Sequence, residues 1–359
     1  MNGRNLVHAT GATRRSRELA LGALGLVARV RSVPTHPAGG SRSTLRILAL
    51  TPTYVPKHRR GAEVTLHQLL VDLQQRGHEV RVVAGAGDRA GTFDGIDVRV
   101  RSSRRAVLRD GEWADIVFGQ LTDRWSALSL GARARRPVVY LMHIGGTAKR
   151  ALYGAPDLTV FCSHALRARH PWIAPAIVVH PPIDAARYAT TRGDAITLVN
   201  LTAAKGAGLF YTLAAREPER QFLAVRGWEP ELRVGTPPAN CTVLDQVDDM
   251  REVFSRTRVL LVPSEYEAYG RVGLEAAVSG IPTIAHPADG LVEALGTAAL
   301  WADRADPEAW IACLRSLDDP TEYERRSVAA RARFEALDPA TEIAALERAL
   351  LQLRTTWTG

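Results

Sequence analysis

The sequence predicts an α/β protein with two domains, each built from Rossmann-like βαβ units. Its 359 residues suffice for two hydrophobic cores, and a hydrophobic content of 46% is that of an ordinary globular chain. Short β-branched runs alternate with amphipathic helical segments between residues 45 and 285, as in parallel sheets covered by helices. From Asp306 onward the pattern is helical throughout, so we expect a helical C-terminal tail.

The first 44 residues differ from the rest of the chain. They carry seven arginines against a single acid, Glu18, and their apolar piece, 19–28, is far too short to span a bilayer. We expect residues 1–44 to be a basic, disordered extension. A basic helix lying on a membrane surface is the alternative. A signal peptide is disfavoured because charged residues flank the apolar piece directly.

Residues 45–184 are expected to form the first domain. It opens with a buried strand at 46–52, followed by a basic loop at 54–61, an amphipathic helix that ends at Gly77, and a strand at 79–83. This βαβ unit lacks the GxGxxG fingerprint, which disfavours a nicotinamide enzyme. The basic loop either binds an anionic acceptor or is a solvated run of charges.

Further strands of the first domain are expected at 96–101, 114–118, 138–142 and 157–163. Trp125 and Leu128 indicate a short amphipathic helix that packs in the core. His143 lies at the carboxyl end of the strand 138–142, where parallel sheets bind ligands. It is either a structural histidine or a site residue. Ser163 is expected to cap the helix that follows it.

Residues 185–338 form the expected second domain, and residues 339–359 a final helix. The domain begins with a strand at 195–201, and Lys205 and Gly206 lie in the loop before the next helix. A lysine in such a loop is well placed to meet a phosphate at the helix N-terminus. Further strands are expected at 222–227 and 241–244, and a helix cap at Asp248 and Asp249.

One stretch of the second domain contains the densest set of candidate site residues. An apolar strand, 259–262, leads into a loop, a helix over 271–279 that stops at Gly280, and a strand over 281–285. The loop therefore lies at the carboxyl end of a parallel strand, where ligands bind.

Two glutamates mark this stretch: Glu267 in the loop and Glu275 in the helix, with seven residues between them. The backbone N–H groups of Gly270, Arg271 and Val272 form the open helix end, which binds phosphate through its unpaired donors and its dipole. A carboxylate beside it can accept hydrogen bonds from sugar hydroxyls. These features suggest a nucleotide-sugar site, although solvated glutamates on an ordinary loop would have the same spacing.

The stretch resembles the signature of family 4 of the retaining glycosyltransferases, which have the GT-B fold. The motifs that carry the resemblance are Tyr269-Gly270-Arg271-Val272, Leu274-Glu275-Ala276 and Gly280-Ile281-Pro282, together with the spacing of the two glutamates. The resemblance covers about residues 45–350 and is strongest from 195 to 296. It implies two Rossmann-like domains that face one another across a cleft, and a last helix that crosses back onto the first domain.

The resemblance also implies residue roles. Glu275 would hold the ribose hydroxyls, Glu267 would contact the donor sugar, and His143 would lie near that sugar. Two departures stand out: Asn200 occupies the usual place of a phosphate-binding arginine, so Arg271 or Arg226 would have to compensate, and Asp289-Gly290 replace a Gly-Gly pair. Matching elements elsewhere are the phosphate-binding Lys205-Gly206 and the donor and acceptor loop Gly61-Ala62-Glu63.

The implied activity is retaining, metal-independent transfer of a hexosyl group from a nucleoside-diphosphate sugar to a hydroxyl acceptor. The acceptor is a glycan, a lipid-linked molecule or a small molecule, and the net charge of +8 suits an anionic one. No cofactor or metal is expected, because no histidine or carboxylate cluster has convincing ligand spacing. A nucleotide-sugar epimerase of GT-B fold and a non-catalytic basic binding protein remain as alternatives.

The three cysteines indicate the compartment. Cys162, Cys241 and Cys313 are too few and too isolated for a disulfide framework, and Cys162 and Cys313 lie in apolar segments typical of core thiols. We therefore expect a reducing, cytoplasmic location, with peripheral contact to the inner membrane face as an open alternative. The sequence shows no motif that reads DNA or RNA, so no nucleic-acid partner is expected.

Overall fold

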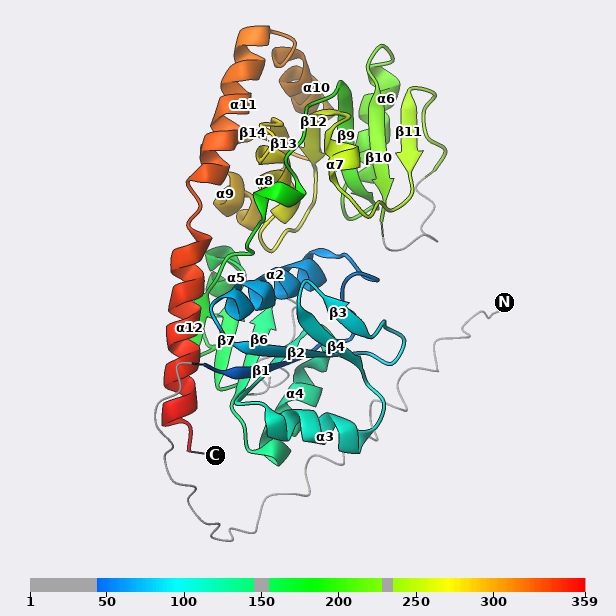
Figure 1. The fold of residues 1–359 in the computed structure, drawn as a ribbon. Coiled ribbons are helices and arrows are strands. Elements are labelled where there is room, and N and C mark those ends of the chain that lie inside the picture. Colours follow the sequence, from blue (N-terminus) through cyan, green and yellow to red (C-terminus); the bar gives the residue numbers. More distant parts are fainter. Residues whose placement is uncertain (1–43, 145–154, 228–234, 359) are drawn as a thin grey trace, which may run out of the picture. The chain divides into compact units, whose positions relative to one another are not determined.

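A computed structural model describes residues 44–144, 155–227 and 235–358. It contains two mainly parallel β-sheets, each with helices packed against it (Figure 1), which confirms the expected α/β fold. The expectation of a disordered extension lies outside the described residues, apart from residue 44. None of the helices in the described ranges is both long and apolar enough to cross a lipid bilayer.

The first sheet has the order β3-β4-β2-β1-β5-β6-β7-β8, and only β3 runs antiparallel to its neighbour. Its chain order reverses beside β1, which pairs with β2 on one side and β5 on the other. Its strands are β1 (Arg46–Leu50), β2 (Glu79–Ala84), β3 (Gly91–Phe93), β4 (Ile96–Val100), β5 (Ile116–Gln120), β6 (Val138–Met142), β7 (Leu158–Phe161) and β8 (Ala176–Val178).

Helices cover both faces of the first sheet. On one face, Leu66 and Leu70 of α2 pack in the same cluster as Leu346 and Leu350 of the last helix, α12. On the other face, Leu130 belongs to a second cluster with α3 and α4. The helices of this sheet are α2 (Gly61–Gln75), α3 (Arg104–Trp113), α4 (Arg124–Ala134) and α5 (His164–Ala168), with the 3-10 turn η1 (Leu121–Asp123).

The second sheet is parallel throughout, with the order β11-β10-β9-β12-β13-β14. Its chain order reverses beside β9, which lies between β10 and β12. The strands are β9 (Ala195–Leu201), β10 (Phe222–Arg226), β11 (Cys241–Leu244), β12 (Thr257–Val262), β13 (Thr283–Ala285) and β14 (Leu300–Trp301).

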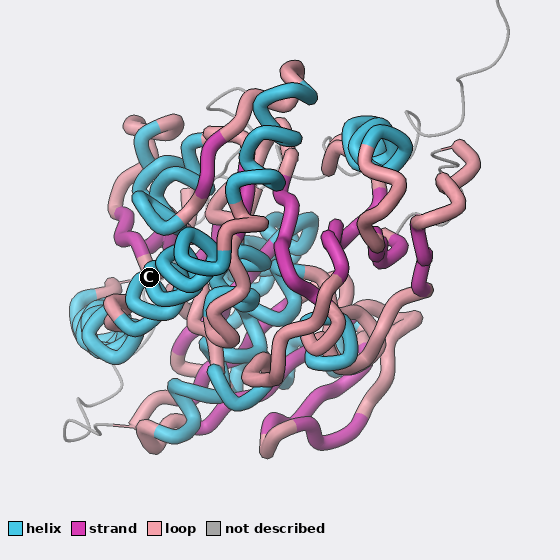
Figure 2. Tube along the Cα trace, turned by 90° about the horizontal axis from the view of Figure 1, so that it is seen from above, coloured by secondary structure: helices cyan, strands magenta, loops and turns pink. Residues whose placement is uncertain are grey.

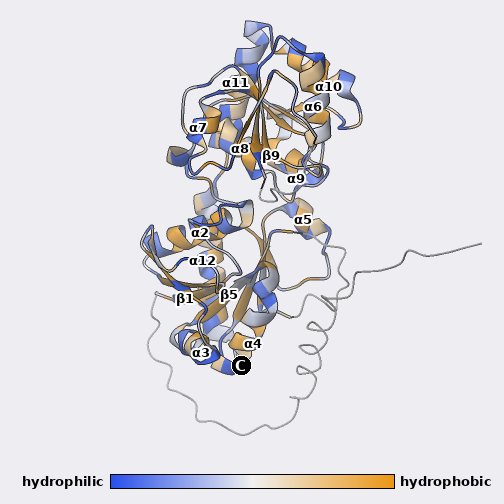
Figure 3. Ribbon diagram, turned by 90° about the vertical axis from the view of Figure 1, so that its right-hand side faces the viewer, coloured by the Kyte–Doolittle hydropathy of each residue, from blue (hydrophilic) through white to orange (hydrophobic). Residues whose placement is uncertain are grey.

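The helices of the second domain follow its strands along the chain. Figure 2 shows the helices and strands of the described residues by colour. The helices of the second domain are α6 (Ala207–Arg216), α7 (Arg251–Phe254), α8 (Arg271–Ala277), α9 (Asp289–Leu295), α10 (Pro307–Ser316) and α11 (Pro320–Glu335), followed by α12 (Pro339–Thr356), with the 3-10 turns η3 (Ala185–Arg187) and η4 (Gly296–Ala298). In Figure 3 the strands near β1, β5 and β9 are mostly hydrophobic, whereas the helices show both colours, as buried sheets with amphipathic covers require.

Several local expectations are confirmed. Strands form at 138–142, 195–201 and 241–244 as predicted. The Ser163 hydroxyl accepts a hydrogen bond from the Leu166 N–H at 3.0 Å and so caps α5. Cys162 is buried as expected.

Among the other local expectations, the one for Trp125 is wrong, and those for the cap at Asp248 and Asp249 and for Cys313 are met only in part. Trp125 does not pack in the core: it is 54% exposed and lies under the Arg124 guanidinium on the surface of α4. The Asp249 carboxylate accepts from the Arg251 N–H at 2.9 Å and so caps the start of α7, although Met250 occupies the N-cap position itself. Cys313 is half-buried at the edge of a core cluster. Each of these depends on tertiary neighbours that the local sequence does not specify.

Candidate active site

The point where the second sheet reverses its chain order lies between β9 and β12. In parallel sheets this is where the strand-to-helix loops diverge and leave room for a ligand. The loop after β9 carries Lys205 and the loop after β12 carries Glu267. The Lys205 ammonium forms an ion pair with Glu267 Oε1, which also accepts a hydrogen bond from Ser264 Oγ at 2.8 Å. The fold thus brings together two predicted site residues that lie 62 positions apart.

Glycines before two helices let these loops fold tightly. Gly206, at the start of α6, has φ +86°, and a Cβ there would lie 2.5 Å from Pro263 Cγ. Gly270, at the start of α8, has φ +91°, and its Cβ would lie 2.4 Å from Leu291 Cδ2. Only glycine combines left-handed backbone with such close neighbours. Neither residue lines the cavity described next, so each shapes the loop.

A cavity of about 830 Å³ adjoins the switch point. Residues of both domains line it, including Arg59 and His67 from the first. Of the predicted site residues, Gly61, Lys205, Glu267, Arg271, Val272 and Glu275 line it, whereas Ala62, Glu63, His143, Gly206 and Gly270 do not.

Glu275 is 8% exposed and points its carboxylate at Arg271, one helical turn earlier. Arg271 Nε donates to Glu275 Oε1 at 2.6 Å. The guanidinium is also bonded to Pro182 O, Gln68 Oε1 and the Tyr188 hydroxyl. The Arg271 side chain is therefore not placed to replace the family's phosphate-binding arginine.

The other candidate for that charge, Arg226, does line the cavity and forms an ion pair with Asp245 at 3.0 Å. Asn200 lines the cavity as well, with φ +70°, a left-handed conformation that asparagine tolerates better than most residues. Its buried Oδ1 has no hydrogen-bond partner among the described residues.

His143 follows β6 in the first domain. Its Nε2 lies 3.0 Å from Gln120 Oε1, and Gln120 Nε2 donates to Thr51 Oγ1 at 2.9 Å. Because an amide oxygen only accepts, Nε2 carries the proton and Nδ1 keeps its lone pair. Burial, with a smaller effect of the nearby Arg271 charge, lowers the pKa of His143 to about 4. The ring is therefore neutral at physiological pH.

The Gly61-Ala62-Glu63 element begins α2 beside the cavity. Glu63 is fully buried and accepts a hydrogen bond from Thr53 Oγ1 at 2.5 Å, while its Oε2 has no partner among the described residues. Only Gly61 of the three reaches the cavity wall. Glu63 thus anchors the loop after β1 from within the domain.

A polar chain next to this wall was not predicted. His67 Nδ1 lies 2.9 Å from the Tyr54 hydroxyl, and His67 Nε2 lies 2.9 Å from Asp94 Oδ2. Asp94 also forms an ion pair with Arg187. Burial lowers the pKa of His67 and outweighs the opposing effect of Asp94. These residues come from four separate segments, so no local spacing in the sequence predicts their contacts.

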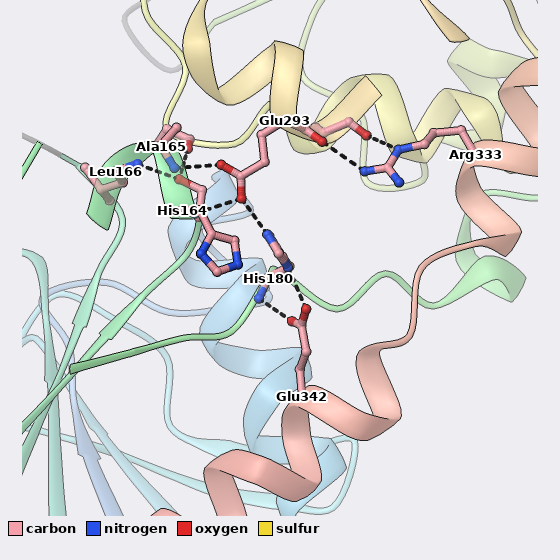
Figure 4. Close-up of polar contacts among 10 residues, drawn as sticks. His164, Ala165, Leu166, His180, Glu293, Arg333 and Glu342 are labelled. Atoms are coloured by element: carbon pink, nitrogen blue, oxygen red, sulfur yellow. Dashed lines mark hydrogen bonds and ion pairs between the residues drawn. The ribbon is translucent and has the colours of Figure 1, made fainter. Parts of the chain in front are cut away.

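A second unpredicted cluster centres on His180, in the segment that links the two sheets (Figure 4). Its Nδ1 lies 2.7 Å from Glu342 Oε1 and its Nε2 lies 2.7 Å from Glu293 Oε1. The Tyr269 ring stacks on it at 4.8 Å. Burial alone would lower the pKa of His180, but its hydrogen bonds to Glu293 and Glu342 raise it to about 9. His180 is therefore an imidazolium held between two carboxylates.

His164, His180 and Glu293 also offer three groups of metal-ligating type within 4.8 Å of one another, which the sequence did not reveal. Two ligands of a tetrahedral zinc ion lie about 3.3 Å apart. The 2.7 Å contact between His180 and Glu293 is shorter and is that of a hydrogen bond. In this conformation the cluster is therefore an ion-pair network. Glu293 also accepts from the N–H groups of His164 and Ala165 at 2.7 Å.

Comparison with known proteins agrees with the fold and with the predicted resemblance. Residues 209–319 match the family described as Glycosyl transferases group 1. A D-inositol 3-phosphate glycosyltransferase of Corynebacterium kroppenstedtii is 35% identical over 74 residues, 20% of this chain and 16% of that protein. A glycogen synthase of Mycobacterium tuberculosis is 36% identical over 89 residues, 24% of this chain and 22% of that protein. The matched segments thus span less than a quarter of either curated relative.

Solved structures match over much more of the chain. Anabaena HepE in complex with UDP and glucose superposes with a TM-score of 0.70 and 18% identity, over 86% of this chain and all of that one. WaaG, a glycosyltransferase of lipopolysaccharide biosynthesis, gives a TM-score of 0.64 and 15% identity, over 85% of this chain and 99% of that one. At these identities the likeness concerns the fold, and it confirms the GT-B architecture.

Proposed function

We propose that this protein is a retaining glycosyltransferase that moves a hexosyl group from a nucleoside-diphosphate sugar to a hydroxyl acceptor without a metal ion. The observation that carries the proposal is the contact between Lys205 and Glu267 at the switch point, beside a cavity that Glu275 also lines. These residues lie in or next to the segment that matches the glycosyltransferase family.

In this proposal the donor binds against the wall of the cavity that the second domain forms. Glu275 accepts hydrogen bonds from the ribose hydroxyls, and Glu267 accepts them from the sugar. Lys205 pairs with the diphosphate, together with the backbone N–H groups from Gly270 to Val272. Because Lys205 is bonded to Glu267 here, the diphosphate must take over the ammonium and so releases the Glu267 carboxylate toward the sugar.

The acceptor binds against the wall that the first domain forms, near Gly61. Its hydroxyl oxygen attacks the anomeric carbon from the side that the nucleotide leaves, so the configuration is retained. The bond from that carbon to the β-phosphate oxygen breaks, and the hydroxyl proton passes to the departing diphosphate. Lys205 and the loop amides stabilise the charge that develops there. His143 is neutral and supplies a hydrogen bond near the sugar, and it carries no charge toward the reaction.

UDP-glucose is the first donor to test, because HepE has been solved with UDP, with UDP and glucose together, and with UDP-glucose. The basic loop with Arg59 and Arg60 on the cavity wall supports an anionic acceptor, small or lipid-linked. We place the enzyme in the cytoplasm, with peripheral contact to the inner membrane face if the acceptor is lipid-linked.

The test is thermal stabilisation by UDP-, GDP-, ADP- and dTDP-sugars, followed by product analysis with the donor that binds. A ligand at 100 times its dissociation constant adds roughly 2.7 kcal/mol to the unfolding free energy, so a binder is easily detected. We expect one nucleotide to stabilise and its sugar to reach an added acceptor. An altered nucleotide-sugar formed without acceptor would indicate an epimerase, and no stabilisation by any donor would refute the proposal.

A further inference from the structure

We propose that Arg271 is a positioning residue, whose buried guanidinium fixes the Glu275 carboxylate for the nucleotide and ties it to the first domain through Gln68. This inference rests on the proposed function, because it takes Glu275 as a donor-binding group. It assigns a role to a side chain for which the sequence suggested only compensation of a missing phosphate contact.

The evidence begins with the hydrogen bonds of the guanidinium. Nε donates to Glu275 Oε1 at 2.6 Å, and Nη1 donates to the Pro182 carbonyl at 2.7 Å. Nη2 donates to Gln68 Oε1 at 2.7 Å and to the Tyr188 hydroxyl at 3.2 Å. All three nitrogens are bonded, and Arg271 is only 9% exposed. The planar fork of arginine suits such divergent partners, whereas a lysine could reach one or two of them.

The four partners belong to four different segments. Glu275 lies on α8 with Arg271, Pro182 lies in the segment between the sheets, Tyr188 follows η3, and Gln68 lies on α2 of the first domain. One side chain therefore connects the helix of the predicted nucleotide site to the linker and to the first domain.

The free-energy cost of burying two charges explains why the pair of Arg271 and Glu275 needs additional hydrogen bonds. Removing two charges from water costs several kcal/mol for each ion, and only good geometry with additional hydrogen bonds compensates. Arg271 meets that condition because each nitrogen has an acceptor. Without the Arg271 guanidinium, the Glu275 carboxylate, which is 8% exposed, would be a buried charge without its main partner. A carboxylate with a fixed rotamer binds two neighbouring hydroxyls with less loss of entropy.

The test is a double-mutant cycle on nucleoside-diphosphate affinity, measured by calorimetry with the nucleotide that stabilises the wild type. Arg271→Lys keeps the charge and removes the fork, and Glu275→Gln removes the carboxylate charge. We expect each single variant to bind the nucleotide at least tenfold more weakly than the wild type. The double variant should bind no more weakly than the single variant with the lower affinity, because both changes break the same Arg271–Glu275 interaction. The inference would be overturned if the two losses of affinity multiplied in the double variant, or if Arg271→Lys bound the nucleotide as tightly as the wild type. A wild type that binds no nucleotide would instead remove the proposed function.

A second pair of variants keeps the test decisive if Arg271→Lys does not fold. Tyr188→Phe removes the hydroxyl that accepts from Arg271 Nη2 and leaves the buried ring. Tyr323→Phe is the control, because its hydroxyl donates to the Arg258 carbonyl and neither Tyr323 nor Arg258 lines the cavity, which Tyr188 does. We expect about a threefold loss of diphosphate affinity for Tyr188→Phe and none for Tyr323→Phe. Equal affinities would mean that Arg271 does not act through Glu275.

Discussion

At the scale of single residues, the contact between Lys205 and Glu267 is the central feature of the candidate site. A lysine that is expected to bind phosphate is already paired with a glutamate that is expected to bind sugar. Both side chains are largely enclosed, with 28% and 16% of their side-chain surface exposed, so the pair is better shielded than an exposed surface ion pair. In the proposed complex a diphosphate would compete with Glu267 for the same ammonium, and this competition can be measured.

Glu267→Gln should separate binding from turnover. The amide keeps the size of the side chain and loses the charge, so turnover should fall roughly tenfold to a thousandfold. Affinity for the bare diphosphate should not fall and should rise up to a few-fold, because Lys205 loses a competing carboxylate. Radiolabelled transfer and calorimetry measure the two quantities. Glu265→Gln is the control, since Glu265 is exposed and pairs with Arg304. A loss of diphosphate affinity would place Glu267 at the nucleotide.

The backbone at Gly206 leads to the second prediction. Its φ of +86° and the 2.5 Å approach to Pro263 should make Gly206→Ala destabilising by about 1–3 kcal/mol. Gly208→Ala, two residues on in α6, meets nothing within 4 Å and should instead stabilise by about 0.5–1 kcal/mol. Chemical denaturation of both variants checks the opposite signs. If both alanines stabilise, then the loop does not require the left-handed conformation.

At the scale of elements, His180 connects three of them. It lies in the segment after β8, and its two carboxylate partners lie on α9 and α12. Other ionisable or aromatic groups around it are His164 on α5, the Tyr269 ring, and Arg333, which donates to the carbonyls of Glu293 and Ala294. The network therefore joins the linker, the second domain and the last helix.

The pH dependence of stability should reveal this network. The pKa of His180 rises from 6.5 to about 9, so its contribution is complete below pH 6.5 and is lost as the pH rises through 9. The pKa values of Glu293 and Glu342 are lowered from 4.5, chiefly by His180 against an opposing effect of burial, so their contribution is lost as the pH falls below 4.5.

The unfolding free energy of the wild type should therefore exceed that of His180→Gln most between about pH 4.5 and 6.5. The difference should shrink toward pH 10. Denaturation curves across this range measure it, with His58→Gln, in the basic loop, as the control. A difference that does not change with pH would show that His180 is neutral in the folded protein.

The elements themselves were largely predictable, and the reason is periodicity. Buried strands such as β6 and β9 are continuous β-branched runs, and α2 has a clear apolar side, so their positions follow from local sequence. The short strands β3 and β8, of three residues each, carry too few residues for a pattern. Trp125 was placed in the core by helical spacing alone, whereas the structure exposes it.

The candidate site was predictable only in part. The spacing from Arg271 to Glu275 is one helical turn and already permits their ion pair. Its partners Gln68 and Tyr188 lie 203 and 83 residues away, which no local pattern encodes. The same holds for His180, whose partners lie 113 and 162 residues away. Long-range polar contacts of this kind depend on the packing of distant elements.

On the scale of the whole molecule, the first domain supplies one wall of the cavity and the second domain the other. Leu346 and Leu350 of α12 pack with α2 in the core of the first domain, although α12 follows the second domain in the chain. The two domains are connected by the segment around His180, by the helix α12, and by polar contacts such as Arg271–Gln68 and those of Glu293 with the His164 and Ala165 N–H groups. These contacts link the wall of the cavity proposed to bind the nucleotide to the wall proposed to bind the acceptor.

The charges around the cavity lead to the last prediction, which concerns metal dependence. The walls carry Lys205 and Arg226, while the one group of metal-ligating side chains found in the described ranges, around His180, does not line the cavity. Fixed cations can stabilise the departing diphosphate in place of a divalent ion. Transfer should therefore continue at its full rate in excess EDTA, and Lys205→Ala should lower turnover about a hundredfold. Lys57→Ala is the control and should not lower it, because the Lys57 ammonium donates to the Gly87 carbonyl and does not line the cavity. Activity that disappears with EDTA and returns with magnesium or manganese would mean that a metal ion, and not Lys205, neutralises the leaving group.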